Sequence, residues 1–212
     1  MLKSIHADIL NKPFSQIKEL KLHHPDDIDS IKQNHKSTWD IFKIFILSIY
    51  QNLPNNIAKP HIESWCNGWQ IRNHYFAYFK DKNFIQNAPI ISILLNKKRF
   101  IIQLDWHAYK SKISKSTLQN YHNWLNEIDI KNFDGFYFYK NTTSEYDDFM
   151  PIYQFDINKL MDDLMMNDKD WYKLAFVIKK EDLDDYQDKQ LIDLSVNVIL
   201  KLMTVYYHCQ SI

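Results

Sequence analysis

Glycine is almost absent from this chain, since Gly68 and Gly135 are the two glycines among 212 residues. Loops that cradle phosphate groups need several glycines, because their backbone adopts positive φ values and approaches the ligand closely. The sequence contains neither a GxGxxG turn nor a Walker A loop. This shortage excludes the common dinucleotide-binding and phosphate-loop enzymes.

Cysteine and excess charge are also lacking. Cys66 and Cys209 lie far apart and show no CxxC or Cys/His spacing typical of a zinc site, so we expect reduced thiols. The 26 lysines and arginines balance 26 aspartates and glutamates, which leaves no overall field to attract nucleic-acid backbones or anionic lipid. The sequence therefore disfavours extended nucleic-acid binding but still permits a local basic patch.

No long uninterrupted hydrophobic run is present. The most apolar stretch, residues 191–207, contains Asp193, Asn197 and Lys201, which a lipid-exposed span would not carry. The N-terminal residues lack the apolar segment and cleavage site of a secretory signal. We therefore expect a cytoplasmic protein with no membrane contact.

What the chain does have is material for a core, because 45% of its residues are hydrophobic and 15% are aromatic. We expect one α+β domain over residues 1–212, with helices packed on one face of an antiparallel sheet of about five strands. Residues 1–60 should be mostly helical, 69–180 should carry the sheet and its intervening helices, and 188–208 should form a long C-terminal helix.

Periodicity places the individual elements. Helices are expected near residues 14–20, from Ser37 to before Pro54, from Ser116 to 128, near 160–165 and over 189–208. Ser37 and Ser116 are the expected helix starts, because each opens a capping-box pattern. Strands are expected within 69–79, 89–96, 99–106, 135–140 and 171–180.

Two of these strands are joined so tightly that Lys97 and Lys98 should form a hairpin turn. That turn sets a register, which pairs Asn96 with Arg99, Leu94 with Ile101, Ser92 with Gln103 and Ile90 with Asp105.

Alternation divides the segment RFIIQLDWHAYK into two chemically different faces. One face is apolar and comprises Phe100, Ile102, Leu104 and Trp106. The other carries Arg99, Gln103, Asp105 and His107, with Ile101 among them. Arg72 and His74 of the neighbouring strand can join this second, polar face.

The polar face is the candidate site. His107 is the candidate general base, with Asp105 orienting it, and the same two side chains are candidate ligands for a divalent cation. Arg72, His74, Gln103 and Tyr109 are the candidate ligand-binding residues, with Arg72 suited to clamp an anion. The alternative is that this face is the polar, solvent-exposed side of a half-covered sheet.

A second candidate is the acid-rich segment SEYDDF, residues 144–149, in which Glu145 and Asp147 are weak candidate metal ligands. Its spacing matches no EF-hand loop, and a solvated turn is the alternative. A nuclease of the PD-(D/E)xK kind is poorly matched, because His107 stands where its lysine should follow Asp105. No GxSxG or HExxH motif is present.

The aromatic residues allow one further hypothesis, a pocket that stacks a planar ligand such as a nucleobase. Such a pocket needs a positively charged rim, and the candidate rim residues are Arg72, Lys80, Lys110 and Lys112. The candidate lining residues are Trp65, Trp69, Tyr75, Phe76, Tyr78, Trp106 and Tyr109, although such residues more often belong to a core.

The stretch PIISILLNKKRFIIQLDWHAYKSK, followed by SEYDDF and WYKLAFVIKK, resembles a small bacterial protein family of about this length. That family has sometimes carried the label bacterial glucose-6-phosphate 1-dehydrogenase. The label implies a nicotinamide cofactor, which is usually held by a glycine-rich turn before a helix, and this chain lacks that turn. No catalytic residue is therefore carried over from the resemblance.

Three functions remain open from the sequence. The first is a module that binds a small anionic or planar ligand, or a nucleotide, on the polar face. The second is a metal-dependent hydrolase or nuclease that uses Asp105, His107 and a carboxylate of residues 144–149. The third is a protein-interaction or inhibitor domain without a pocket. The sequence does not identify a cofactor, an oligomeric state or a biological process.

Overall fold

A computed structural model of the protein describes residues 2–167 and 169–210. Within these residues the chain forms one antiparallel sheet of seven strands in the order β1-β2-β3-β4-β7-β5-β6. The strands are β1 (His61–Ile62), β2 (His74–Phe79), β3 (Pro89–Asn96), β4 (Arg99–Trp106), β5 (Phe136–Lys140), β6 (Met150–Pro151) and β7 (Tyr172–Lys179). The fold class is therefore α+β, as predicted, with two more strands than expected, because β1 and β6 are only two residues long.

The helices are α1 (Ser4–Asp8), α2 (Ile17–His23), α3 (Ile28–Gln51), α4 (Leu118–His122), α5 (Trp124–Glu127), α6 (Ile157–Met166) and α7 (Asp188–Tyr206). The short 3-10 turns are η1 (Lys82–Phe84), η2 (Ala108–Lys110), η3 (Ile130–Phe133), η4 (Ile152–Gln154), η5 (Glu181–Asp185) and η6 (Tyr207–Cys209). The described part of the chain contains no helix with the length and apolar character needed to cross a membrane. Both cysteines are free thiols.

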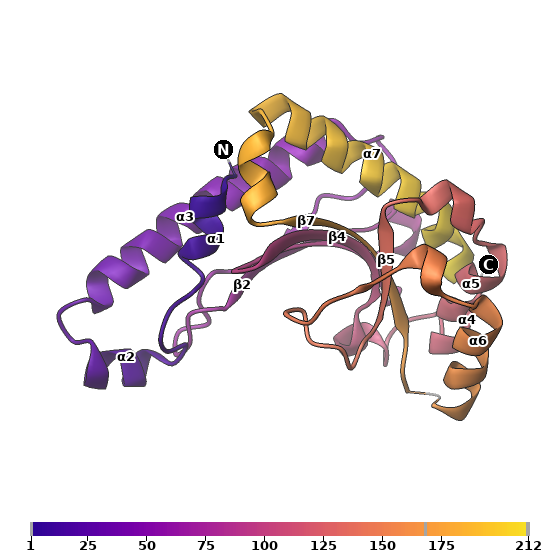
Figure 1. Cartoon of the computed structure of the whole chain (residues 1–212), viewed down its shortest axis with the longest axis horizontal. Coiled ribbons are helices and arrows are strands. Elements are labelled where there is room, and N and C mark those ends of the chain that lie inside the picture. The colour runs from indigo at the N-terminus through magenta and orange to yellow at the C-terminus, as the bar shows by residue number, and fades with distance from the viewer. Residues whose placement is uncertain (1, 168, 211–212) are drawn as a thin grey trace.

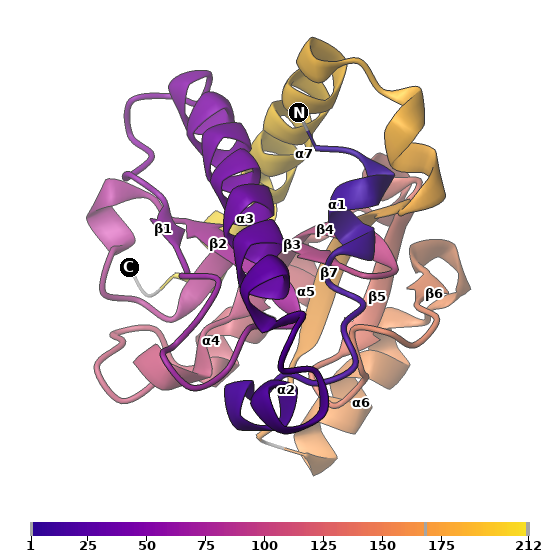
Figure 2. The ribbon, with the colours of Figure 1, turned by 90° about the vertical axis from the view of Figure 1, so that its left-hand side faces the viewer.

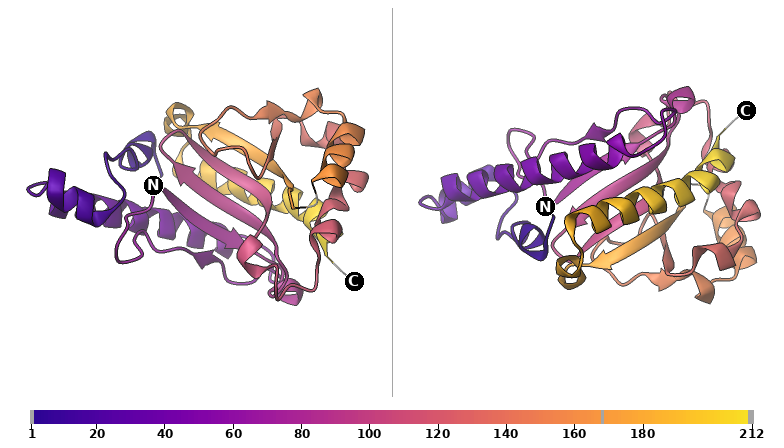
Figure 3. Two further views of the ribbon diagram at one scale, coloured as in Figure 1. Left: turned by 90° about the horizontal axis from the view of Figure 1, so that it is seen from below. Right: turned by 90° about the horizontal axis from the view of Figure 1, so that it is seen from above.

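The two long helices cover one face of the curved sheet. Figure 1 shows α3 and α7 above the strands, and the view from above in Figure 3 shows both helices lying over the sheet. Phe42, Phe45 and Ile46 of α3 join Phe100 and Ile102 of β4 in the main hydrophobic core. This arrangement confirms the predicted helical layer and the long C-terminal helix.

The smaller helices lie at the ends of this layer. Figure 1 shows α4, α5 and α6 gathered at the end of the sheet that carries β5. Figure 2 shows α1 beside the segment that precedes α7, where Lys3 Nζ donates to the Tyr186 carbonyl at 2.7 Å. The N-terminus is thereby attached to the C-terminal third of the chain.

The predicted start of the long helix is wrong. The helix begins at Ile28 and not at Ser37, which is an exposed residue in its middle. Ile28, His35, Thr38 and Phe42 are buried at helical spacing, so one continuous buried stripe runs past Ser37. Tertiary packing of that stripe decides the helix boundary over the local capping pattern.

Two smaller boundaries also differ from expectation. The capping box before α4 uses Thr117 and Asn120 and not Ser116 and Gln119. β2 begins at His74, because Gln70 and Ile71 form only isolated bridges, to Gln16 and Cys66.

The hairpin of β3 and β4 has the predicted register. Leu94 pairs with Ile101, Ser92 with Gln103, and Ile90 with Asp105. Every residue of both strands is buried, on each face of the sheet. The face opposite the helices is therefore also covered, and it contains the candidate site.

Candidate functional site

The polar face of β4 exists as predicted, but it is not open to solvent. Arg99, Gln103 and Asp105 are 9%, 2% and 8% exposed. Residues 141–149, which connect β5 to β6 and which Figure 1 shows beneath the sheet, cover Arg99 through Phe149. Gln103 and Asp105 are instead in contact with Tyr139, Trp171 and Lys173. The interpretation of β4 as a solvated, half-covered strand is therefore wrong.

Phe149 anchors this covering segment. Its ring stacks on Tyr139 of β5 with centroids 3.9 Å apart and planes at 3°, and the Arg99 guanidinium carbon lies 4.7 Å from its ring centroid. Phe149 and Tyr139 form a second hydrophobic cluster with Leu94, Ile101 and Ala175 on the face away from α3 and α7. A small apolar core thus forms on the face that the sequence presents as polar.

Asp105 lies in a buried hydrogen-bond network. Trp171 Nε1 donates to Asp105 Oδ1 at 2.8 Å, and Lys173 Nζ lies 3.2 Å from Asp105 Oδ2. Gln103 Nε2 donates to the same Oδ2 at 3.3 Å, while the Tyr139 hydroxyl donates to Gln103 Oε1. Burial raises the pKa of Tyr139 well above its ordinary value, which keeps this hydroxyl a neutral donor. The Asp105 carboxylate is thus held by structural partners.

His107 lies directly after β4 and is half-buried. Its ring centroid is 5.2 Å from that of Tyr78 and 6.0 Å from that of Tyr109. Its Nδ1 atom is buried and has no hydrogen-bond partner among the described residues, so Asp105 does not orient it. Burial and the nearby positive charge of Lys80 lower the pKa of His107, which favours a neutral imidazole.

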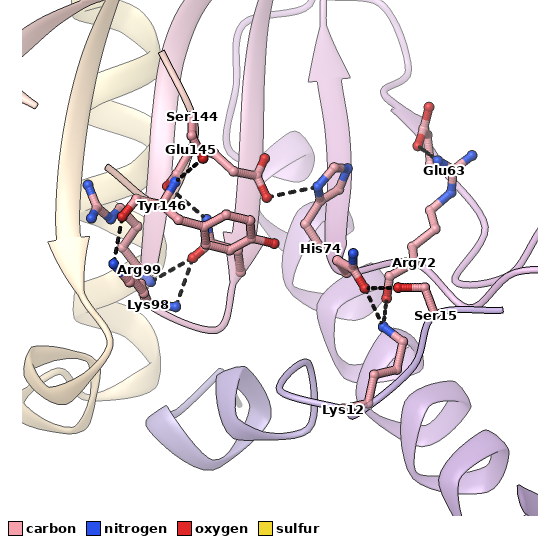
Figure 4. Close-up of polar contacts among 12 residues, drawn as sticks. Lys12, Ser15, Glu63, Arg72, His74, Lys98, Arg99, Ser144, Glu145 and Tyr146 are labelled. Carbon is pink, nitrogen blue, oxygen red and sulfur yellow. Dashed lines mark hydrogen bonds and ion pairs between the residues drawn. The ribbon is translucent and has the colours of Figure 1, made fainter. Parts of the chain in front are cut away.

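Arg72 and His74 are occupied by other partners. Arg72 Nη1 lies 3.0 Å from Glu63 Oε2, and Arg72 Nε donates to the Ser64 carbonyl at 3.0 Å. His74 Nδ1 lies 3.1 Å from Glu145 Oε1, so it ties the covering segment to β2, as Figure 4 shows. Burial raises the pKa of Glu145, but the hydrogen bond and charge of His74 outweigh it, and the pKa lies below its ordinary value.

The remaining predicted residues do not converge. Tyr109 is 94% exposed, and Asp147 accepts a 3.3 Å hydrogen bond from the Ser144 amide within its own turn. Across residues 2–167 and 169–210, no cluster of three or more His, Cys, Asp or Glu side chains is arranged to hold a metal ion. The structure brings Gln103 and Asp105 together. The other candidate metal ligands, His107, Glu145 and Asp147, do not form a cluster with Asp105 that could hold a metal ion.

A hollow of about 610 Å³ opens beside Arg99, on the same face of the sheet. We name it the Arg99 hollow. It is lined by five cationic side chains, three carboxylates, two aromatic rings and one valine: Lys97, Lys98, Arg99, Lys179, Lys180, Asp148, Glu181, Asp182, Tyr137, Phe149 and Val177. Lys180 is paired with Asp8 at 2.7 Å, and Lys98 Nζ donates to the Tyr146 carbonyl at 2.6 Å, as Figure 4 shows for the latter pair.

Arg99 differs from these lysines. Over the residues that the structure describes, no carboxylate lies within ion-pair distance of its guanidinium, whose one specific contact is the Phe149 ring. Sequence reasoning placed Arg99 on the polar face but did not select it as a binding residue. No local signal distinguishes it, because the hollow is formed by segments from 97–99, 137, 148–149 and 177–182.

Comparison with known proteins extends over nearly the whole fold. A protein-family model matches residues 2–209. The chain belongs to this family. It is also 37% identical over 205 residues to a Haemophilus influenzae (strain ATCC 51907 / DSM 11121 / KW20 / Rd) protein that carries the name "Uncharacterized protein". That similarity covers 97% of this chain and 96% of the relative, so the sheet, the covering segment and the Arg99 hollow all fall within the matched region.

Proposed function

We propose that this protein is a small-molecule-binding module, and that its ligand is an anion with a planar ring, such as a nucleotide, bound in the Arg99 hollow. The observation that carries the proposal is Arg99 itself. It is a largely buried arginine that lines the hollow, and among the described residues no carboxylate lies within ion-pair distance of its guanidinium.

Burial makes this lack of a partner costly. A charge removed from water is unfavourable unless it is paired and hydrogen-bonded, and Arg99 is 9% exposed. A guanidinium presents a fork of N–H donors that matches a carboxylate or a phosphate with two parallel hydrogen bonds. An anion bound in the hollow would supply the missing partner of the guanidinium.

The rest of the hollow supports the same ligand class. Its volume of about 610 Å³ lies within the range of roughly 300–1,000 Å³ that small-molecule sites occupy. Its cationic side chains outnumber its carboxylates by five to three. Tyr137 and Phe149 add aromatic surface, on which a planar ring can stack.

The chain offers a matched control, because Arg72 and Arg99 are its two arginines. Arg72 is paired with Glu63 and does not line the hollow. The test is a thermal-shift screen of the wild type, Arg99→Met and Arg72→Met against nucleotides, sugar phosphates and dicarboxylates. A ligand that binds only the folded state, at one hundred times its Kd, stabilises it by about 2.7 kcal/mol.

We expect at least one ligand to raise the Tm of the wild type and of Arg72→Met, and to raise that of Arg99→Met much less. Loss of a charged bidentate contact should weaken binding by a factor of about ten or more. Equal shifts in Arg99→Met and the wild type would refute the assignment, as would a screen in which no anion shifts the wild type.

A further inference from the structure

A second pocket, of about 300 Å³, lies at the opposite end of β2 and β4 from the Arg99 hollow. We name it the lysine pocket. It is lined by Ala58, Lys59, Pro60, His61, Tyr78, Lys80, Ile85, Gln86 and Lys110. None of these residues is an aspartate or a glutamate.

The three lysines come from three separate parts of the chain. Lys59 precedes β1, Lys80 follows β2, and Lys110 ends η2. The fold therefore brings three like charges to one small pocket, although the chain as a whole has a formal net charge of zero. Like charges that converge at short range destabilise one another unless an opposite charge lies between them.

Lys80 is the fixed charge of this group. It is 4% exposed, and its Nζ donates to the Ile85 carbonyl at 3.0 Å and to the Asn87 carbonyl. An ammonium group has three donors, so these two carbonyls leave one N–H for a further acceptor. Burial, followed by the charge of Lys110, lowers the pKa of Lys80 to about 8, because both disfavour the charged ammonium.

Aromatic rings form the wall beside these charges. Tyr78 stacks on His61 with centroids 5.0 Å apart and planes at 27°, and the His107 ring lies 5.2 Å from it. The Lys80 ammonium lies 5.7 Å from the Tyr78 ring centroid. Tyr78 and His61 line one side of the pocket, and its other polar side chains are the three lysines and Gln86.

We propose that the lysine pocket binds a phosphate-class oxyanion, either inorganic phosphate or the phosphate of a phosphomonoester. Lysine ammonium groups act as compact point charges with adjustable donors, which suit the oxygens of a tetrahedral anion better than the planar geometry of a carboxylate. This site is separate from the Arg99 hollow and goes beyond the function proposed for it.

The test is isothermal titration of the full chain with inorganic phosphate and, in a second arm, with a sugar phosphate, against chloride at equal ionic strength. Lys59→Gln and Lys110→Gln remove one charge each from partly or fully exposed positions, where folding is least affected. Lys112→Gln is the matched control, because Lys112 is exposed and outside the lining. Arg99→Met is the second control, because it changes only the other hollow.

We expect saturable phosphate binding by the wild type, Lys112→Gln and Arg99→Met, weakened about tenfold in Lys59→Gln and in Lys110→Gln. Binding in either arm that Lys59→Gln and Lys110→Gln weaken supports the proposal, and the tighter arm identifies the source of the anion. No binding in both arms overturns it, and so does binding that Lys59→Gln and Lys110→Gln leave unchanged. A result in which only Arg99→Met loses phosphate would assign the anion to the Arg99 hollow and would also overturn this proposal.

Discussion

Asp105 allows the sharpest test of this structure, because the sequence presents it as a catalytic group and the structure holds it as a buried acceptor. In the variant Asp105→Ala, Trp171 Nε1 loses its acceptor and the Lys173 ammonium loses its counter-ion. Removing one partner of a buried ion pair costs about 3–5 kcal/mol, since the other charge remains uncompensated. The side chains of Lys173 and Asp105 are 17% and 11% exposed, so we expect a loss of stability near the lower end of this range, about 3 kcal/mol.

Equilibrium unfolding in urea measures this loss. With a slope of roughly 1–3 kcal/mol per molar urea, a loss of about 3 kcal/mol lowers the midpoint by about 1 M or more at unchanged slope. Asp40→Ala is the matched control, because Asp40 is an exposed acid on α3 and its removal should change stability by about 0.5 kcal/mol or less. A midpoint for Asp105→Ala equal to that of Asp40→Ala would refute the structural role.

A second substitution separates charge from packing. Lys173→Met in the Asp105→Ala background removes the uncompensated ammonium and should restore part of the lost stability. Asp105→Asn keeps an oxygen for Trp171 Nε1 and should cost less than Asp105→Ala. If Lys173→Met lowers the stability of Asp105→Ala further, the ion pair is not the source of the effect.

Two further predictions concern buried rings. Burial, followed by the charge of Lys12, lowers the pKa of His35 to about 4, whereas the unfolded value is about 6.5. The neutral imidazole therefore stabilises the folded state fully above pH 6.5, and this stability is lost as the pH falls to 4. Urea unfolding should lose about 3 kcal/mol over that window in the wild type and clearly less in His35→Gln, and parallel pH profiles would contradict this. Phe149→Ala should cost about 3–5 kcal/mol because it leaves a cavity over Tyr139, and Phe149→Leu, which loses the stack but keeps most of the apolar volume, should cost less. Equal urea midpoints for the two variants would show that apolar volume at this position contributes little.

The elements that were predicted correctly are those whose signal is local. The register of β3 and β4 follows from a two-residue turn and from alternation, and both are contained in residues 89–106. The start of α3 is not local, because Ile28 and His35 become helical by packing a stripe that continues into Phe42. The short strands β1 and β6 form only because β2 and β5 are already in place, so their two-residue sequences carry no pattern of their own.

The candidate site was predicted only in part, because only part of its signal is local in sequence. Alternation correctly assigned Gln103 and Asp105 to one face, since side-chain direction in a strand has a period of two. It gave no information on what covers that face. Tyr139, Phe149 and Lys173 supply the cover and the counter-ion, and they lie more than thirty residues away along the chain.

The acid-rich segment 144–149 is a second case in which the local sequence does not predict the tertiary contacts. Its composition favours a solvated turn or a metal site, yet Glu145 binds His74 and Phe149 packs on Tyr139, so two of its residues fasten it to the sheet. The contact with His74 joins the segment to a strand 71 residues away, whereas Tyr139 lies in the strand that immediately precedes the segment. A polar residue on a strand therefore becomes a binding group or a structural group according to which distant segment reaches it.

Arg72 and Arg99 illustrate this difference between a structural group and a binding group. Both stand near polar neighbours in the sequence, and Arg72 was the one selected as an anion clamp. The fold brings Glu63 to Arg72 and satisfies its charge, whereas it brings the Phe149 ring to Arg99 and leaves the guanidinium edge facing a hollow. Because a buried charge is unfavourable until it is paired, the arginine that the fold leaves without a carboxylate is the one at which a ligand gains most by binding.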